Sequence, residues 1–235
     1  MSRSLSGTNC NNARHEMTRL LLADVTPLEE PEVYARAYAG CSAERRSAAD
    51  VFRFGKDRRL SIGAALLLDR GLAAYGLKER DMIYGHGAFG KPFFINAQDI
   101  HFSISHSGNK VAVAFSDSEV GCDIEMIGDA DLTLAQMFFS RSEYETLLSM
   151  GEELERRKAF FRCWTLKESY MKAIGKGLNI APESFSVFPG PAVSGGMLED
   201  SGFVFLSPES FPGYECSLCF KPENTEPEVI LCELF

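Results

Sequence analysis

Three side chains that could do chemistry share one face of a predicted helix. Trp164, Glu168 and Lys172 are spaced four residues apart, so they stack along that face. Gly175 and Gly177 then end the helix, because glycine permits a left-handed exit that other residues disfavour. An acid and a base beside this glycine turn suit a metal-bound phosphate. The same spacing is also typical of a surface ion pair, and this segment alone leaves both interpretations open.

A strand-like segment offers two more carboxylates. Alternate side chains of a strand share a face, so Asp123 and Glu125 point the same way. Two neighbouring carboxylates repel each other unless a cation neutralises them. Oxygen ligands without histidine or cysteine between them suit magnesium better than zinc, and Glu168 would supply a third. An exposed edge strand with a charged face is the alternative interpretation.

A third segment carries a cation and several hydroxyl groups. Lys91 follows a glycine and precedes a proline, which places it at a turn entering a strand. In the next strand, alternation puts His101, Ser103 and Ser105 on one face. The strand ends in a turn signal, so Ser105 and His106 could bind phosphate oxygens. An ordinary hairpin turn with a solvated histidine is the alternative.

Together these segments resemble the 4′-phosphopantetheinyl transferases of the type that activates surfactin synthetase. The matching motifs, in chain order, are Gly-Lys-Pro at 90–92, Phe-Ser-Ile-Ser-His-Ser-Gly at 102–108, Val-Gly-Cys-Asp-Ile-Glu at 120–125, and Trp-Thr-Leu-Lys-Glu-Ser at 164–169 with Lys172, Gly175, Gly177 and Leu178. Each motif is weak alone, but four in this order are specific. Cys122 departs from the family, which usually has an aliphatic residue there. It faces away from Asp123, so we expect a small core residue.

The resemblance implies a reaction, a metal and a partner. Such enzymes move 4′-phosphopantetheine from coenzyme A to a serine of an apo acyl or peptidyl carrier protein and release adenosine 3′,5′-bisphosphate. Asp123, Glu125 and Glu168 are the implied Mg²⁺ ligands. The implied catalytic residues are Glu168, as general base, and Lys172, which contacts the pyrophosphate and stabilises the leaving phosphate. Phosphoryl transfer depends mostly on positioning and electrostatics, so no protein nucleophile is expected.

The coenzyme A contacts are expected mainly in the first half of the chain. A basic cluster at 45–59 is the natural place for the 3′-phosphate, although it also fits the solvated face of a helix. The resemblance is loose there, with Arg45 near a family lysine and Ser61 near a family threonine. The residues expected to bind coenzyme A are Arg45, Arg53, Lys56, Ser61, Lys91, Ser105, His106 and Lys172.

Composition restricts the partners. The 235 residues carry a net charge of −9, which argues against nucleic acid as a partner. Positive charge must therefore be local to the cleft, since coenzyme A is itself acidic. Seven cysteines show no disulfide framework, and Cys216 and Cys219 would face opposite sides of a strand, a poor metal clip. We expect reduced cysteines in a cytoplasmic enzyme. No apolar run approaches the roughly 20 residues that span a membrane.

The element order predicts an α+β protein of two lobes. Residues 1–16 are expected to be a disordered leader, 17–117 an N-terminal lobe and 118–235 a C-terminal lobe. Strands are expected at 18–25, 93–95, 100–105, 111–115, 120–125, 184–188, 203–206, 214–220 and 229–234, and helices at 31–39, 43–54, 57–75, 132–138, 141–150 and 152–174. Asp57 is a predicted N-cap, and Ser140 with Glu143 a predicted capping box.

Pseudo-symmetry between the lobes, with the active site in the cleft between them, follows from the family resemblance. A chain that carries both lobes could assemble this site as a monomer. Two other functions fit part of the pattern. A non-catalytic relative that binds coenzyme A or a carrier would lack a metal ligand or Lys172, and all of these are present. A magnesium-dependent phosphohydrolase fits the carboxylates but not the spacing of the motifs.

Overall fold

The computed structural model describes residues 18–187, 195–198, 201–222 and 226–235. The predicted leader at 1–16 lies outside the described residues. The α-helices are α1 (Pro31–Gly40), α2 (Ala43–Asp50), α3 (Gly55–Leu72), α4 (Leu132–Phe138), α5 (Arg141–Ser149) and α6 (Glu153–Ala173). The strands are β1 (Arg19–Asp24), β2 (Tyr84–His86), β3 (Pro92–Phe94), β4 (His101–Ser107), β5 (Lys110–Ser116), β6 (Val120–Met126), β7 (Gly195–Leu198), β8 (Phe203–Leu206), β9 (Tyr214–Phe220) and β10 (Glu228–Cys232).

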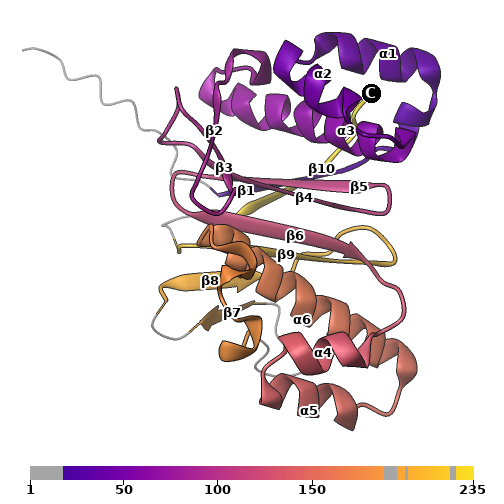
Figure 1. Cartoon of the computed structure of the whole chain (residues 1–235), viewed down its shortest axis with the longest axis vertical. Helices are drawn as coiled ribbons and strands as arrows, with labels where there is room; N and C mark the ends of the chain where they lie inside the picture. The colour runs from indigo at the N-terminus through magenta and orange to yellow at the C-terminus, as the bar shows by residue number, and fades with distance from the viewer. Residues whose placement is uncertain (1–17, 188–194, 199–200, 223–225) are drawn as a thin grey trace, which may run out of the picture.

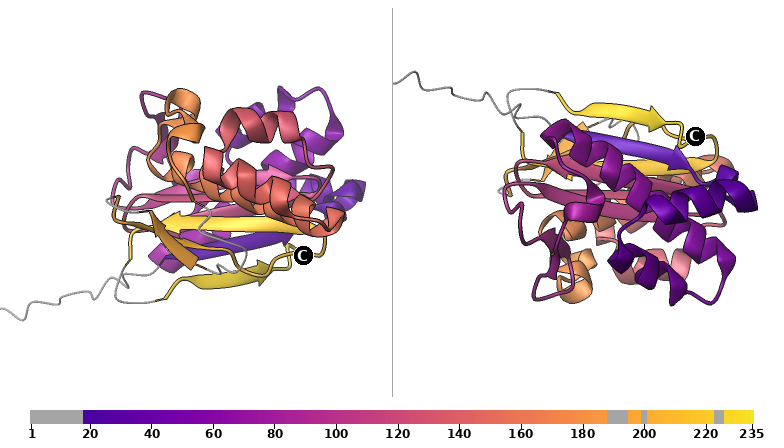
Figure 2. Two further views of the ribbon diagram at one scale, coloured as in Figure 1. Left: turned by 90° about the horizontal axis from the view of Figure 1, so that it is seen from below. Right: turned by 90° about the horizontal axis from the view of Figure 1, so that it is seen from above.

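Two sheets lie face to face in the middle of the molecule, with helices on both outer sides (Figure 1). The first sheet has the order β10-β1-β5-β4 and is covered by α1, α2 and α3. The second has the order β6-β9-β8-β7 and is covered by α6, on which α4 and α5 pack (Figure 2). A small hairpin of β2 and β3 extends from the first lobe. The predicted α+β class with two lobes is confirmed.

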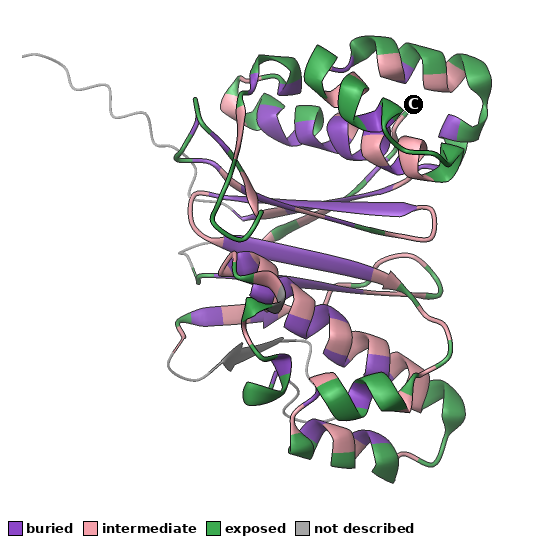
Figure 3. Ribbon diagram, in the orientation of Figure 1, coloured by how far each residue is buried: buried purple, intermediate pink, exposed green. Residues whose placement is uncertain are grey.

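The alternation of side chains along β1 explains how one strand serves two cores. Leu21 and Ala23 face the helices of the first lobe, whereas Leu20 and Leu22 face the second sheet. The same apolar layer between the sheets contains Cys122 and is almost free of solvent, and β5 and β6 are buried along most of their length (Figure 3). Cys122 is therefore the small core residue that its position predicted.

The last strand of the chain joins the sheet of the first lobe. β10 runs parallel to β1, with Leu20 opposite Val229, so it lies in a different sheet from β9, the strand that precedes it in sequence (Figure 2). The division of the chain at 117/118 stays a prediction, and β10 is a strand that this division would not place beside β1. Within the described residues, no helix is both long and apolar enough to cross a membrane.

Of two predicted helix starts, one is confirmed and one is wrong. The capping box at Ser140 is confirmed, since its hydroxyl accepts from the amide of Glu143 and that carboxylate accepts from the amide of Ser140. The predicted N-cap at Asp57 is wrong. α3 begins two residues earlier, and Asp57 lies in its first turn, where an acidic side chain stabilises the helix dipole.

The strand predicted at 184–188 is wrong for the described residues. Pro182–Ser184 forms a 3-10 helix, and no strand follows it up to Val187. The reason is that the backbone here bonds to side chains instead of to a neighbouring strand. Lys167 donates to the carbonyls of Pro182 and Phe185, and the amide of Val187 donates to Glu143.

Candidate active site

Three serines connect the two sheets at the place where the lobes meet. β4 and β6 are each the end strand of their sheet, and the serines of β4 accept hydrogen bonds from alternate amides of β6. The bonds run from Cys122 N to Ser103 Oγ (3.1 Å), from Ile124 N to Ser105 Oγ (3.4 Å) and from Met126 N to Ser107 Oγ (3.1 Å). This serine ladder satisfies amides that an unpaired strand edge would leave open. It also holds the predicted carboxylate strand beside the predicted phosphate-binding strand.

Asp123 is the centre of the site. It is 2% exposed, which excludes the alternative of a solvated charged strand face. Its Oδ1 accepts a hydrogen bond from Ser105 Oγ at 2.6 Å and from Lys172 Nζ at 2.6 Å, and the same Nζ lies 3.0 Å from Ser105 Oγ. β4, β6 and α6 thus each contribute one side chain to a charge-assisted network. Three of the residues predicted from separate motifs are brought together here.

The second oxygen of Asp123 is left without a partner. Oδ2 is buried, and no hydrogen bond reaches it from the described residues. A buried carboxylate oxygen without a donor costs about 1–3 kcal/mol, so such atoms call for an explanation. A divalent cation fits this oxygen, since a hard cation prefers carboxylate ligands.

Glu125 and Glu168 lie close enough to Asp123 for its charge to affect the pKa of both glutamates. Burial raises the pKa of both glutamates above the ordinary value of 4.5, and the charge of Asp123 raises it further. A hydrogen bond from Ser107 partly offsets this for Glu125. Among the residues described, no three acidic, histidine or cysteine side chains already form a group that could hold an ion. The three predicted ligands are therefore neighbours, not an assembled triad.

Lys172 is the cation of this network. Burial opposes its charge, but the neighbouring groups, Asp123 foremost among them, together outweigh burial and raise the pKa of the ammonium above its usual value. The ion pair is thus with Asp123, across 49 residues of sequence, not the i,i+4 surface pair that the helix pattern allowed. Desolvation, followed by the nearby Lys172 ammonium, lowers the pKa of His106.

A cavity of about 280 Å³ opens beside this network, between the lobes. The first lobe contributes Phe89, Lys91, Pro92, Phe102, Ser103 and Ile104, and the second contributes Glu168, Met171, Lys172, Gly175 and Gly177. Its wall therefore contains a carboxylate and an ammonium group on the α6 side and aromatic rings on the other. Such a mixed, concave surface is typical of a small-molecule site.

Arg45 lies at the rim of an adjoining cavity of about 220 Å³. Its guanidinium is 3.3 Å from the hydroxyl of Tyr84, 3.7 Å from the buried carboxylate of Glu79 and 5.3 Å from the centre of the Tyr84 ring. Tyr84 also donates to Glu79 at 2.9 Å. Phe102 lines both this cavity and the one beside Lys172. Arg45 is a predicted coenzyme A contact, and it is thus oriented by Glu79 and Tyr84. The sequence analysis did not single out these two residues.

The other members of the basic cluster lie apart. Arg53 stacks on the ring of Phe54, 5.6 Å from its centre, at an exposed position. Lys56 lines a different cavity, with Asn109 and Tyr214, and Ser61 is half-buried on α3. The structure does not place these three beside Asp123, and their contact with coenzyme A stays a prediction.

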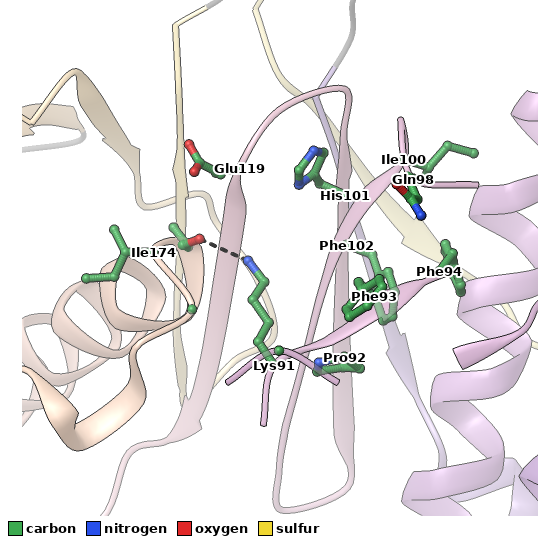
Figure 4. A pocket seen from close by; sticks show the side chains of 13 residues that line it. Lys91, Pro92, Phe93, Phe94, Gln98, Ile100, His101, Phe102, Glu119 and Ile174 are labelled. Carbon is green, nitrogen blue, oxygen red and sulfur yellow. Dashed lines mark hydrogen bonds between the residues drawn. The ribbon is translucent and has the colours of Figure 1, made fainter. Parts of the chain in front are cut away.

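Lys91 crosses from the first lobe to the second. Its Nζ donates to the carbonyl of Val120 at 2.9 Å. It also donates to the carbonyl of Ala173 at 3.0 Å, the bond drawn as a dashed line in Figure 4. Burial lowers the pKa of this amine to about 8. The side chain also lines a larger cavity, of about 580 Å³, which His101 and Glu119 border. The amine of Lys91 is therefore bonded to the protein itself.

The motif around Glu168 contains a second lysine, Lys167, to which the sequence analysis gave no role and which is buried. Lys167 and Glu143 form an ion pair of 2.8 Å with side chains 2% and 0% exposed. The remaining bonds of this pair run from Lys167 to Pro182 O and Phe185 O and from the amides of Ser140 and Val187 to Glu143. Every oxygen of Glu143 has a donor. The capping-box signal at Glu143 was the available hint in the sequence.

Gly121 explains how β6 and α6 come so close. A Cβ at this position would lie 1.9 Å from the carbonyl oxygen of Ser169 and 2.4 Å from the amide nitrogen of Ala173. Only a residue without a side chain permits this approach. The glycine before the carboxylates therefore sets the distance between the strand that carries Asp123 and the helix that carries Lys172.

Comparison with known proteins points to one family. The sequence profile of the 4′-phosphopantetheinyl transferase superfamily matches residues 119–219. A 4′-phosphopantetheinyl transferase of Bacillus pumilus is 36% identical over 199 residues, which is 82% of this chain and 84% of that protein. One of Aneurinibacillus migulanus is 33% identical over 206 residues, 86% of each chain, and one of Bacillus subtilis strain 168 is 35% identical over 162 residues, 68% of this chain and 71% of its own.

Proposed function

Because this chain belongs to the 4′-phosphopantetheinyl transferase superfamily, we propose that it moves the 4′-phosphopantetheine arm of coenzyme A onto a serine hydroxyl of an acyl or peptidyl carrier protein. The apo carrier becomes the holo carrier, and adenosine 3′,5′-bisphosphate is released. One observation carries this proposal. Asp123 shares one oxygen with Lys172 and Ser105 and keeps its other oxygen buried without a donor, beside an inter-lobe cavity.

Asp123, Glu125 and Glu168 would hold the divalent cation, with Mg²⁺ favoured by their hard carboxylate oxygens. When bound, the cation would neutralise charge on the pyrophosphate of coenzyme A. The unpartnered Oδ2 of Asp123 supports this assignment. So do the raised pKa values of the two glutamates, of which burial is the main cause and the charge of Asp123 a further one, because a cation would offset both the cost of burying the carboxylates and their repulsion.

In the proposed reaction, Glu168 accepts a proton and Lys172 stabilises the leaving group. The serine oxygen of the carrier forms a bond to the β-phosphorus, and the bond from that phosphorus to the bridging oxygen breaks. Glu168 takes the serine proton, for which a pKa raised towards the working pH suits it. Lys172, whose raised pKa keeps it charged, stabilises the negative charge on the leaving bisphosphate.

Coenzyme A occupies the two adjoining cavities of about 280 and 220 Å³. Ser105 and His106 bind its phosphates, and Arg45, already oriented by Glu79, binds the 3′-phosphate. Lys91 contributes its stem to the cavity wall, because its amine is bonded to two carbonyls. The remaining contacts with coenzyme A, away from Asp123, come from Arg53, Lys56 and Ser61. One chain supplies Ser105, Asp123 and Lys172, which supports the proposal that the enzyme acts as a monomer.

Intact-mass analysis of an apo carrier protein tests the function. The carrier is incubated with this protein, coenzyme A and Mg²⁺, and the expected product has gained one phosphopantetheine. Chelation of the metal, or replacement of the acceptor serine of the carrier by alanine, should abolish the gain. No gain on any acyl or peptidyl carrier would overturn the proposal in favour of a binding protein. Cleavage of coenzyme A without a carrier would indicate a hydrolase.

A further inference from the structure

Lys91 makes an inter-lobe contact that the reaction scheme does not use. It lies in the turn between β2 and β3, after Gly90, whose φ of 87° is in the left-handed region. Its stem reaches out of the first lobe (Figure 4), and its Nζ donates to Val120 O and Ala173 O of the second lobe. These are two of the contacts by which the β2–β3 hairpin is attached to the catalytic lobe.

Both acceptors belong to the elements that carry the reacting groups. Val120 is the first residue of β6, three residues before Asp123, and Ala173 is the last residue of α6, next to Lys172. The carbonyl at the end of a helix has no partner within the helix, and a cation there stabilises the helix dipole. A neutral amine would still have two N–H groups for the two carbonyls, so the contact does not depend on charge.

The stem of Lys91 is fitted against the turn that ends α6. A Cβ at Gly175 would lie 3.2 Å from the Cδ of Lys91, and Gly175 has a φ of 67°. Lys91 also lines two cavities, the one beside Glu168 and the larger one beside His101. It is therefore held on one side by the glycine turn and at its tip by both elements, while Gly121 brings β6 and α6 into direct contact.

We propose that Lys91 is a positioning residue, which fixes the end of α6 against the start of β6 and so sets Lys172 beside Asp123. The serine ladder holds the middle and the end of β6 to the first lobe, and Lys91 holds its beginning. A displacement of about 1 Å at a reacting group can cost about 100-fold in rate. This inference rests on the proposed function, because the transferase reaction supplies one of its measurements.

The first test compares Lys91→Met and Lys91→Arg with the wild type in carrier phosphopantetheinylation. Lys91→Met keeps the apolar stem and removes both donors, so kcat should fall about 10-fold with the KM for coenzyme A within about twofold. Lys91→Arg keeps the donors and should restore most of kcat. Exposed Lys176, one residue beyond Gly175, provides the matched control Lys176→Met, which should be unchanged. A raised KM with unchanged kcat would make Lys91 a direct ligand of coenzyme A and overturn the proposal.

A double-mutant cycle with Lys172→Ala tests whether Lys91 acts through Lys172. If it does, Lys91→Met should change the residual kcat of Lys172→Ala by less than about twofold. An undiminished 10-fold loss in that background would overturn the proposal, because it would be the signature of an independent or purely structural role. Should Lys91→Met fail to fold, Lys91→Gln takes its place in the same cycle.

Amide hydrogen exchange gives a measurement that needs no turnover. The amides of Gly175 and Lys176 are bonded to Lys172 O and Met171 O, so they report on the end of α6. They should exchange at least about 10-fold faster in Lys91→Met than in the wild type or in Lys176→Met. Unchanged exchange would overturn the positioning role. A wild type that fails to modify any carrier would instead count against the proposed function, and the exchange result would still decide the role of Lys91.

Discussion

Helix α6 carries two lysine–carboxylate pairs that differ in how fully their polar atoms are bonded. Lys167 and Glu143 are almost fully buried, and each oxygen of Glu143 has a donor. Lys172 and Asp123 form a shorter pair of 2.6 Å, but the lysine side chain is 29% exposed and Oδ2 of the aspartate has no donor within the described part of the chain. The two lysines are five residues apart, about 1.4 turns, so they leave the helix in different directions.

The difference is the one expected between a structural ion pair and an ion pair of an active site. A buried pair with every partner present can only hold its neighbours in place, and removing one member leaves an uncompensated charge. A pair with an unbonded oxygen beside a cavity still has capacity for a ligand. The same residue types on the same helix therefore have different roles, which their burial and partners decide.

The largest expected effect is on the fully bonded pair of Lys167 and Glu143. Lys167→Met should lower the free energy of unfolding by about 3–5 kcal/mol, because Glu143 would be left buried and charged. Denaturant unfolding, monitored by circular dichroism, measures this. The double variant Lys167→Met with Glu143→Leu should recover much of the loss. A single variant that costs less than about 1 kcal/mol would remove the distinction between the two pairs.

The second largest effect is expected at the proposed active site beside the pair of Lys172 and Asp123. Glu168→Gln should lower kcat at least about 100-fold, or roughly 2.7 kcal/mol in activation free energy, because it removes both the proposed base and a proposed metal ligand. The assay is carrier modification under saturating coenzyme A. The free energy of unfolding of the Glu168→Gln variant should not fall, because the substitution removes a carboxylate that repels Asp123. Near-wild-type turnover would show that the site has been placed wrongly.

Metal binding should distinguish the pairs at equilibrium. Mg²⁺ at ten times its Kd should stabilise the wild type by about 1.4 kcal/mol, as expected for a ligand that binds only the folded state. Thermal unfolding with and without a chelator measures the shift, which Asp123→Asn should abolish. Glu119→Gln, which changes a carboxylate paired with Lys221 outside the predicted metal set, is the control and should keep the shift. An Asp123→Asn protein that responds like the wild type would exclude Asp123 as a ligand.

The smallest expected effect is the pH dependence of the metal-free protein. Burial raises the pKa of Glu125 and Glu168 in the folded state above 4.5, so their protonation favours folding. Their stabilising contribution is full below pH 4.5 and is lost as the pH rises through the folded-state values. The unfolding free energy of the wild type, relative to the double variant Glu125→Gln with Glu168→Gln, should therefore rise from pH 7 to pH 5. A difference that stays constant, or falls, would contradict the raised pKa values.

Local pattern predicted much of the fold. The alternation of β6 correctly put Ile124 and Cys122 into the layer between the sheets and the carboxylates on the other face. The helix ends at the glycine turn, and the capping box at Ser140 was found from four residues. The family resemblance, drawn from four short motifs, is confirmed by relatives that match most of the chain.

Prediction failed where distant groups compete with local preference. The segment after Pro182 has strand-like residues, but Lys167 and Glu143 take its backbone groups, and no ladder forms. Asp57 has the chemistry of an N-cap, yet α3 starts at Gly55. The position of β10 beside β1 depends on pairing across the whole chain, for which no short pattern exists. The role of Lys167 was missed because a buried lysine and a surface lysine look alike in sequence.

The sequence by itself determined the reacting residue types, the faces on which they lie and the family to which they belong, because periodicity and motif spacing are local properties. Only the tertiary structure decided which of them meet. Ser105 and Lys172 are 67 residues apart and bond to the same oxygen of Asp123. Gly121 permits the close approach of β6 to α6 that brings Asp123 and Lys172 together. Burial of the site raises the pKa of Glu168. Solvent access and long-range contacts are properties of the packed chain, so the chemistry of these carboxylates was decided there.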